Sequence, residues 1–446
     1  MPNNIILLTI DCLRADRLGC LGYQRNITPN IDFLAKEGIV FSQAFSNGPS
    51  TQFSFPSIFT SCYALTYPPK QFRTVMRIRG SRRASNMAVS LYMPSIYGGT
   101  TLAEILRREG FYTIGIHSNP FLTSYYNYDS GFNKFIQLVD PILVKRDSLL
   151  RDMAFRSRKY FELLCGKSMF DSADKITRAA FDSINENPRK KFFLWLHFMD
   201  AHYPYLAYPR RFLKNTRTYL KRFLNIGDQV KLYEESYESG IKYVDQVIGD
   251  FLRYLQRIGI WIDENFVFLT SDHGEELWEH KGIGHGYKLY DELLHVPLII
   301  DGPMIEKKQM VNCQVELLDV SPTICNLLGI ELPESFRGKS LFATFHSKEV
   351  EGVISEYTKK DESGFSYRDD KWKFILTVRN GAIRRELYDL TKDKKERMNV
   401  YEMNKDIATV YERYLSRHLE EEDITRKRRS LVRRIGEIKR KLTSVI

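Results

Sequence analysis

Long apolar segments are missing from this sequence. No apolar run approaches the roughly 20 residues that a membrane-spanning helix needs, and the first one, residues 5–10, is interrupted by Thr9. The N-terminus also lacks the basic start, the longer apolar core and the cleavage site of a signal peptide. These absences predict a soluble, intracellular protein with a cytoplasmic location.

Cysteine, glycine and proline are too scarce for several protein classes. The 446 residues include six cysteines, none in a Cys-x-x-Cys pair, which argues against a cysteine-rich zinc site. The 26 glycines and 16 prolines exclude a collagen-like chain, and 13% aromatic residues exclude a wholly disordered one. The length predicts about two to three domains and is sufficient for a large core.

Excess positive charge is nearly absent from the body of the chain and gathers at its end. Residues 426–446 hold nine basic side chains and one acidic one, a net +8 of the chain's +11. Their apolar residues recur at helical spacing, as Leu431, Val432, Ile435, Ile438 and Leu442. A basic amphipathic helix predicts peripheral contact with an anionic membrane or a polyanion; the alternative is a solvated helix docked on the protein by its apolar face.

The order of the apolar segments predicts an α/β fold. Short apolar segments alternate with amphipathic helical ones, which is typical of a mostly parallel sheet between helices. Strands are expected at 4–10, 38–45, 112–117, 192–198 and 266–270, and helices at 29–37 and 101–109.

The pattern of apolar and polar residues changes near residue 345. Residues 346–400 alternate short strand-like segments with polar turns, which predicts a small antiparallel sheet, and the pattern of 401–446 is helical. We therefore expect a main domain over 1–345, a small C-terminal subdomain over 346–400 and a basic helical tail over 401–446. The main domain is expected to carry helical insertions at about 141–190 and 209–256.

Polar residues suited to chemistry follow three of the expected strands. Asp11 follows the first, His202 follows 192–198, and Asp272-His273 lies just after 266–270. In open α/β sheets the site lies at the carboxyl ends of the strands, and Asp and neutral His are good ligands for a divalent cation. Asp11 alone also fits a turn or a helix cap, and His197, inside its strand, is expected to be a satisfied core histidine.

A polar loop, residues 46–54, runs into an apolar helical segment. A hydroxyl near a helix N-terminus lies where anions bind favourably. A plain helix cap is the alternative for each Ser or Thr of this loop.

Together, these motifs resemble the sulfatase branch of the alkaline phosphatase superfamily. The resemblance covers roughly residues 1–400 and rests on the Asp11 strand and on residues 56–60, 197–205, 271–275, 282–286, 290–300 and 386–390. It implies an alkaline-phosphatase-like α/β fold, with a large, mostly parallel central sheet between helices and a small C-terminal antiparallel sheet.

The resemblance also implies roles for individual residues. Asp11, Asp272 and His273 match metal ligands, and the nucleophile, a further metal ligand, falls on Thr51. His202 and His285 are expected to flank the transferred group as catalytic residues. His280 and Asn119 are secondary candidates for substrate binding, and His295 is expected to be structural.

The sequence departs from the sulfatase pattern at the motif that supplies the nucleophile of that family. Family sulfatases convert the Cys or Ser of a Cys-x-Pro-x-Arg motif to formylglycine, whereas residues 51–55 read Thr-Gln-Phe-Ser-Phe. Cys12 stands in place of the second strand-end acid, and Ser118 and Pro120 stand in place of sulfate-holding residues. The surviving set resembles the one-metal, threonine-nucleophile members that cleave or transfer phosphodiester groups.

We therefore expect a metal-dependent hydrolase or transferase of a phosphoric ester, foremost a phosphodiester, acting through a covalent Thr51 intermediate. A sulfuric ester hydrolase is the alternative, and a polyanion- or membrane-binding protein without turnover is a remote one. One His with two Asp is compatible with Mn²⁺, Zn²⁺ or Ca²⁺. The sequence predicts no oligomeric state.

Overall fold

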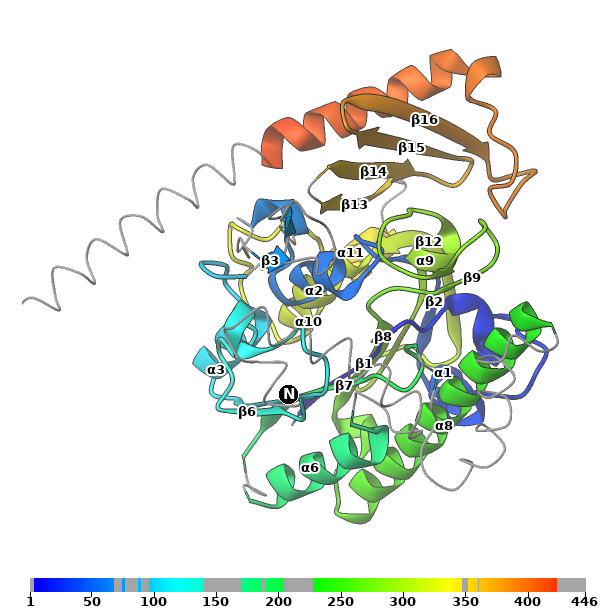
Figure 1. Ribbon diagram of the computed structural model, residues 1–446. Helices are drawn as coiled ribbons and strands as arrows, with labels where there is room; N and C mark the ends of the chain where they lie inside the picture. Colours follow the sequence, from blue (N-terminus) through cyan, green and yellow to red (C-terminus); the bar gives the residue numbers. More distant parts are fainter. Residues whose placement is uncertain are drawn as a thin grey trace, which may run out of the picture. The chain divides into compact units, whose positions relative to one another are not determined.

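The computed structural model of the protein (Figure 1) describes residues 4–67, 74–76, 87–89, 96–139, 171–186, 190–203, 205, 228–346, 352–359 and 361–422. The chain forms two units, each assembled from several segments. The first comprises 1–46, 101–286 and 291–315, and the second comprises 47–100, 287–290 and 316–446. The consecutive domains expected from the sequence, with boundaries at 345 and 400, stay a prediction.

An eight-stranded sheet is the centre of the first unit, and it confirms the predicted large, mostly parallel sheet. Its strand order is β12-β2-β11-β8-β1-β7-β5-β6. Strands β8, β1, β7, β5 and β6 are mutually parallel, and β11 is antiparallel to both β8 and β2. The strands are β1 (Ile5–Ile10), β2 (Ile39–Phe45), β5 (Tyr112–His117), β6 (Lys134–Gln137), β7 (Phe192–Phe198), β8 (Phe266–Ser271), β11 (His295–Asp301) and β12 (Gln309–Glu316).

The register of the central strands brings three strand ends to one edge. Ile10, the last residue of β1, pairs with Phe198 of β7 and with Ser271 of β8. All of β1 is buried, as expected for an apolar strand between two parallel neighbours. The residues that follow these strands therefore start from the same edge of the sheet.

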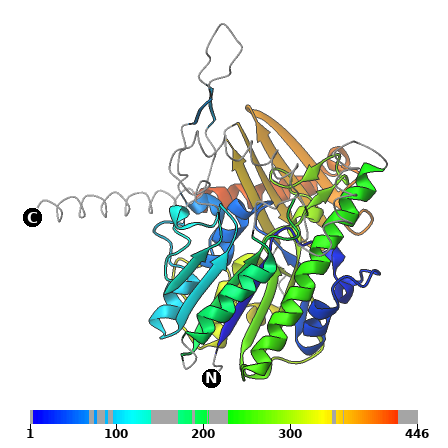
Figure 2. The ribbon, with the colours of Figure 1, turned by 60° about the horizontal axis from the view of Figure 1, so that its bottom comes forward.

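Three helices cover one face of this sheet: α1 (Pro29–Glu37), α6 (Ala173–Asn185) and α8 (Gln229–Arg257). Figure 2 shows α6 and α8 side by side along the sheet. Both fall within the predicted insertions, and their apolar residues belong to the core shared with β1, β7 and β8. Residues 141–170, 187–189 and 209–227 of these ranges lie outside the described part of the chain. Further elements of this unit are α3 (Leu102–Arg108), β9 (Glu276–Leu277), β10 (Ile283–Gly284) and α9 (Asp291–Leu294).

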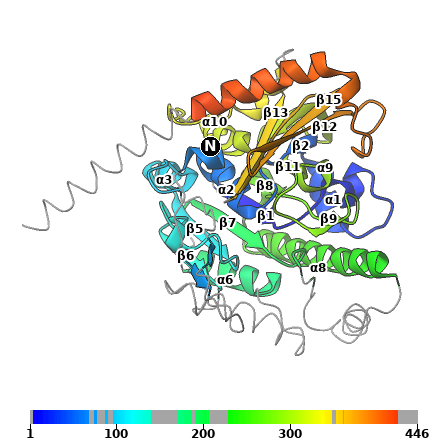
Figure 3. The same cartoon turned by 45° about the horizontal axis from the view of Figure 1, so that its top comes forward.

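The second unit contains the predicted small antiparallel sheet, in the order β13-β14-β15-β16. Its strands are β13 (Val353–Lys359), β14 (Glu362–Arg368), β15 (Trp372–Arg379) and β16 (Ala382–Asp389). A helix over 405–422 packs on this sheet through Ala408, Tyr411 and Leu415 (Figure 3). The unit also holds α2 (Thr51–Thr60), α10 (Val320–Leu327), α11 (Leu341–His346) and the short pair β3 (Thr74–Met76) and β4 (Met87–Val89).

The basic segment 426–446 lies outside the described residues. Among the helices that the structure describes, none combines the length and the apolar character needed to span a membrane.

Helix α8 holds two of the loops that follow the strand ends. The Tyr237 hydroxyl donates to the Cys12 carbonyl at 2.6 Å and accepts from the Arg14 amide at 3.0 Å. At Gly240 the helix approaches the loop after β7 so closely that a Cβ would lie 2.2 Å from the Asp200 carbonyl oxygen. A side chain at position 240 must therefore displace the backbone of this loop.

Replacing Gly240 tests this close approach. Alanine in a helix interior is normally favoured over glycine by about 1 kcal/mol. We expect Gly240→Ala instead to lower the free energy of unfolding by about 1–3 kcal/mol, because the extra methyl overpacks a backbone contact. Denaturant unfolding measures the change, with Glu235→Ala at an exposed position of the same helix as the control. Equal stability of the two variants would contradict the close approach.

Candidate active site

The polar residues that follow β1, β7 and β8 gather at the carboxyl edge of the sheet. Asp11 follows β1, His202 lies in the loop after β7, and Asp272 and His273 follow β8. The side chains of Asp11, Asp272 and His273 are fully buried. A buried charge is costly unless it is paired or coordinates a metal. The burial of the Asp11 and Asp272 carboxylates therefore marks this edge as a candidate functional site.

Asp11, Asp272 and His273 lie close enough to hold one cation. The His273 Nε2 atom is 3.7 Å from Asp11 Oδ1 and 3.4 Å from Asp272 Oδ2. Possible ligand atoms of Asp11, His197 and Asp272 lie within 4.8 Å of one another, as do those of Asp11, Cys12 and His273. Two carboxylates and one imidazole form a donor set that fits a divalent cation. The structure thus brings together three residues predicted to bind metal; their role as ligands stays a prediction.

Neighbouring side chains orient the candidate ligands. Asp11 Oδ2 accepts from Asn119 Nδ2 at 2.9 Å and contacts His197 Nε2 at 3.2 Å. His273 Nδ1 donates to the Gly274 carbonyl at 2.8 Å, which leaves Nε2 on the side of the carboxylates. Such outer hydrogen bonds fix the tautomer and direction of metal ligands.

Two of these supporting residues, His197 and Asn119, contact the candidate ligand Asp11 directly. His197 is buried and hydrogen-bonded, as predicted for a core histidine, but its partner is the candidate ligand Asp11. The position of His197, one residue before the end of a strand, is the feature of the sequence that could indicate a site residue. Asn119 is buried and donates to Asp11, and its role in substrate binding stays a prediction.

The electrostatics keep Asp11 and His273 in their metal-binding protonation states. Burial alone would raise the pKa of Asp11, but the hydrogen bond to His197 and the nearby His202 and His273 hold that pKa well below its usual range. Burial, aided by His285, lowers the pKa of His273 to about 4. At neutral pH Asp11 is therefore an anion and His273 is neutral, as metal coordination requires.

His202 and His285 form the second part of the site. Their ring centroids are 5.0 Å apart, and the His285 ring lies 4.3 Å from that of His273. His285 Nδ1 bonds Glu275 Oε2 at 2.6 Å, and the buried Glu275 also accepts from the Tyr205 hydroxyl at 2.5 Å. Burial opposes a charge on His285, but Glu275 outweighs it and raises the pKa of His285 to about 9. His285 can therefore offer a positive charge to a bound anion.

The remaining predicted residues are Thr51, His280 and His295. Thr51 belongs to the second unit, and each of the two histidines contacts a residue other than the candidate metal ligands. Thr51 is the buried first residue of α2, preceded by Ser50 as the helix cap, and its role as nucleophile stays a prediction. His280 Nδ1 bonds Glu292 Oε1 at 2.6 Å. His295 Nε2 contacts the Ser42 carbonyl at 2.8 Å and its ring stacks on Phe45, consistent with a structural role.

Comparison with known proteins identifies the family. A family model described as sulfatase matches residues 3–330, most of the chain. The chain belongs to the sulfatase family, a hydrolase family of the alkaline phosphatase superfamily. A second model, described as N-sulphoglucosamine sulphohydrolase, C-terminal, matches residues 280–424.

Relatives of this sulfatase-family chain are distant. An uncharacterized sulfatase, YidJ, of Escherichia coli is 25% identical over 439 residues, 90% of this chain and 83% of that protein. Arylsulfatase K of Bos taurus is 28% identical over 184 residues, which are 39% of this chain and 34% of the relative. The match thus spans about a third of arylsulfatase K.

Solved structures support the alkaline-phosphatase-like fold. The phosphonate monoester hydrolase of Agrobacterium radiobacter aligns with a TM-score of 0.68 at 19% identity, covering 96% of each chain. At this identity the likeness shows the fold alone. It confirms the predicted fold class of this sulfatase-family chain.

Removing the Asn119 amide tests how Asp11 is held. We expect Asn119→Ala to weaken binding of Mn²⁺ or Zn²⁺ by about 10–100-fold, because Asp11 loses an orienting donor. Competition with a fluorescent chelator measures the dissociation constant. The matched control is Asn265→Ala, which removes an equally buried amide just before the start of β8. Unchanged affinity in Asn119→Ala, or an equal loss in the control, would contradict this role.

Proposed function

We propose that this protein is a metal-dependent hydrolase of sulfuric or phosphoric esters. The observation that carries the proposal is the convergence of buried Asp11, Asp272 and His273 at the carboxyl edge of the sheet of a sulfatase-family chain. A divalent ion bound there would neutralise ester charge and lower the pKa of a coordinated hydroxyl. Asn119 and His197 would keep Asp11 directed at that ion.

A sulfuric ester is the first candidate substrate. Both family models and the two named relatives carry sulfatase names, so they support this alternative more than the phosphodiester favoured by the sequence motifs. The name N-sulphoglucosamine sulphohydrolase points, by analogy, to a sulfated sugar.

A phosphoric ester is the second candidate, favoured by Thr51. Threonine cannot become formylglycine, and a structural neighbour acts on phosphonate monoesters. An attack by the Thr51 hydroxyl would form a bond to phosphorus and release the leaving alcohol. Because threonine has one hydroxyl, water or an acceptor alcohol must then attack the same phosphorus atom, which gives hydrolysis or transfer.

His285 and His202 would carry out the proton transfers of the reaction. The His285 imidazolium, held by Glu275, would attract ester oxygens and supply a proton to the leaving oxygen. Burial lowers the pKa of His202, and its Nδ1 atom bonds the Tyr203 carbonyl at 2.6 Å, so its Nε2 atom would accept a proton. His280, next to Glu292, stays a secondary candidate for substrate contact.

Location and partners remain proposals from the sequence. The charge of 426–446 supports contact with an anionic membrane or another polyanion, and a cytoplasmic location would allow such contact.

Replacing Thr51 tests the nucleophile and the ester class together. Metal-loaded Thr51→Ala should fold normally and lose at least about 10³-fold in turnover, because no covalent ester can form. The assay compares matched p-nitrophenyl sulfate, phosphodiester and phosphomonoester substrates. Ser54→Ala is the control, since Ser54 lies in the same helix and its buried hydroxyl bonds the Ser50 carbonyl.

Each outcome of this assay has a distinct meaning. Sulfate turnover lost in Thr51→Ala supports the first candidate with a threonine nucleophile, and phosphodiester turnover lost in it supports the second. Full activity in a pure Thr51→Ala preparation would refute Thr51 as the nucleophile.

A further inference from the structure

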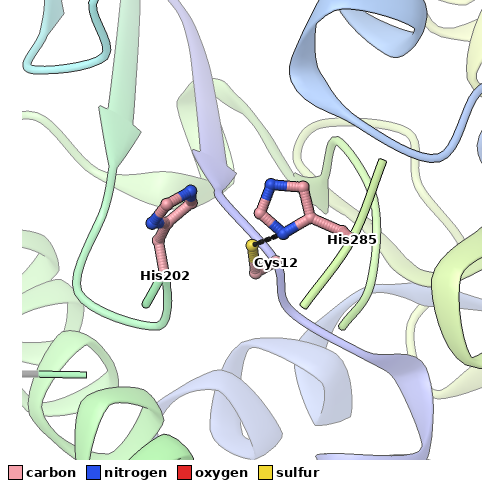
Figure 4. A group of neighbouring side chains, drawn as sticks. All are labelled: Cys12, His202 and His285. Atoms are coloured by element: carbon pink, nitrogen blue, oxygen red, sulfur yellow. Dashed lines mark hydrogen bonds between the residues drawn. The ribbon is translucent and has the colours of Figure 1, made fainter. Parts of the chain in front are cut away.

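A cavity of about 540 Å³ lies in the first unit, between α1, the C-terminal part of α8, the segment before β8 and the end of β11. Asp301, the last residue of β11, lines this cavity and pairs with Val267 near the start of β8. The cavity is therefore at the amino edge of the parallel strands. Cys12, His202 and His285 converge in the candidate active site, at the carboxyl edge (Figure 4). The cavity is thus separate from the site of the ester chemistry.

Asp301 is the buried acid of this cavity, with 2% of its surface exposed. Its Oδ1 atom accepts from the Gly302 amide at 2.8 Å, and none of the residues that the structure describes donates to its Oδ2 atom. A buried carboxylate is costly unless charges or donors compensate it, and burial accordingly raises the pKa of Asp301. Asp301 therefore offers both a hydrogen-bond acceptor and a negative charge to a ligand.

The bases among the described lining residues, Lys307 and Arg253, are paired with other acids. Lys307 Nζ is 3.0 Å from Asp263 Oδ1 and 3.5 Å from Glu37 Oε2. Arg253 Nη2 donates to Asp250 Oδ1 at 2.8 Å. The buried carboxylate of the cavity forms no ion pair with any described residue, so a positive charge on a ligand would compensate it.

Two exposed aromatic side chains line the same cavity. Phe33 of α1 is 62% exposed, and Trp261, which precedes β8, is 53% exposed. The buried Leu34 and Leu252 add apolar surface from α1 and α8. Ligand cavities commonly combine apolar and aromatic walls with a few polar groups, and the face of a tryptophan ring attracts organic cations. This lining suits a ligand that has an apolar body and a positive charge.

We propose that this cavity binds an organic primary amine in its ammonium form. The ammonium group would donate to Asp301 Oδ2, and the apolar body would lie against Phe33 and Trp261. A metal ion fits less well, because the acids of this cavity are not among the described groups whose ligand atoms lie close enough together to share one. A neutral alcohol could donate to Asp301 but would leave its charge without a partner.

Isothermal titration calorimetry on the full-length protein tests this inference with phenethylamine as the probe. Phenethyl alcohol is the matched neutral probe, with the same apolar body. We expect the amine to bind at least about tenfold more tightly than the alcohol, because only the amine brings a positive charge to the buried acid. This comparison uses the wild-type protein and so does not depend on the folding of a variant. Equal affinities, or no measurable binding of the amine, would overturn the proposal.

Replacing Asp301 tests which acid holds the amine. Asp301→Asn keeps the size of the side chain and an oxygen that can accept from the Gly302 amide, so the fold should persist. We expect the affinity for phenethylamine to fall at least about tenfold, to the level of the alcohol. Glu264→Gln is the control, since it removes an equal charge from an exposed residue of the neighbouring turn, Ile262–Glu264. Unchanged affinity in Asp301→Asn, or an equal loss in the control, would refute this role.

Replacing Trp261 tests where the body of the amine lies. We expect Trp261→Ala to weaken binding of phenethylamine by about two- to fivefold, because an exposed ring contributes modestly to cation binding. Trp278→Ala is the matched control, since Trp278 is 51% exposed in the same unit and is not among the residues that line the cavity. Equal effects of the two substitutions would contradict binding in this cavity.

The inference rests on the charges and walls of the cavity and does not depend on the ester chemistry. Selective binding of the amine by a protein that turns over none of the esters would refute the proposed function alone. Ester turnover by a protein that does not distinguish the amine from the alcohol would refute the amine site alone.

Discussion

Three carboxylates buried at the edge of one sheet are the constraint on which the rest of the site depends. Asp11, Asp272 and Glu275 are fully shielded from water. Each buried charge costs several kcal/mol unless partners or a metal compensate it. Asn119 and His197 contact Asp11, and His285 and Tyr205 contact Glu275. The arrangement of imidazoles around this edge follows from the need to balance that negative charge.

The sheet topology makes this concentration of charge possible. Strand β1 lies between β7 and β8 in parallel register, so the residues after all three strands emerge together. Helix α8 then fixes the loops: Tyr237 bonds the turn at Cys12, and Gly240 lets the helix approach Asp200. A close-packed helix under the site keeps acids and imidazoles at fixed separations, which an exposed loop would not do.

Much of the fold and the acidic part of the site could be predicted from sequence. The predicted segments 29–37, 112–117 and 192–198 coincide with α1, β5 and β7, because apolar periodicity and strand burial are local properties. Asp11 and Asp272-His273 stood out because they directly follow apolar strands. The partners of Asp11 could not be predicted, since Asn119 and His197 reach it only through the order of strands in the sheet. The convergence of His202 and His285 on Cys12 depends on contacts between residues distant in sequence in the same way.

Cysteine at position 12, in place of an acid, changes both the charge and the donor atoms at this edge of the sheet. An acid there would add a fourth buried carboxylate and a hard oxygen donor beside Asp11. Cysteine adds no fixed charge, and burial together with Glu275 raises the pKa of its thiol well above the usual range. The thiol is therefore neutral at neutral pH, and it donates a hydrogen bond to Asp11 Oδ1. Exchange of oxygen for sulfur thus lowers the cost of burying this edge, because the thiol adds a hydrogen-bond donor to Asp11 in place of a fourth negative charge.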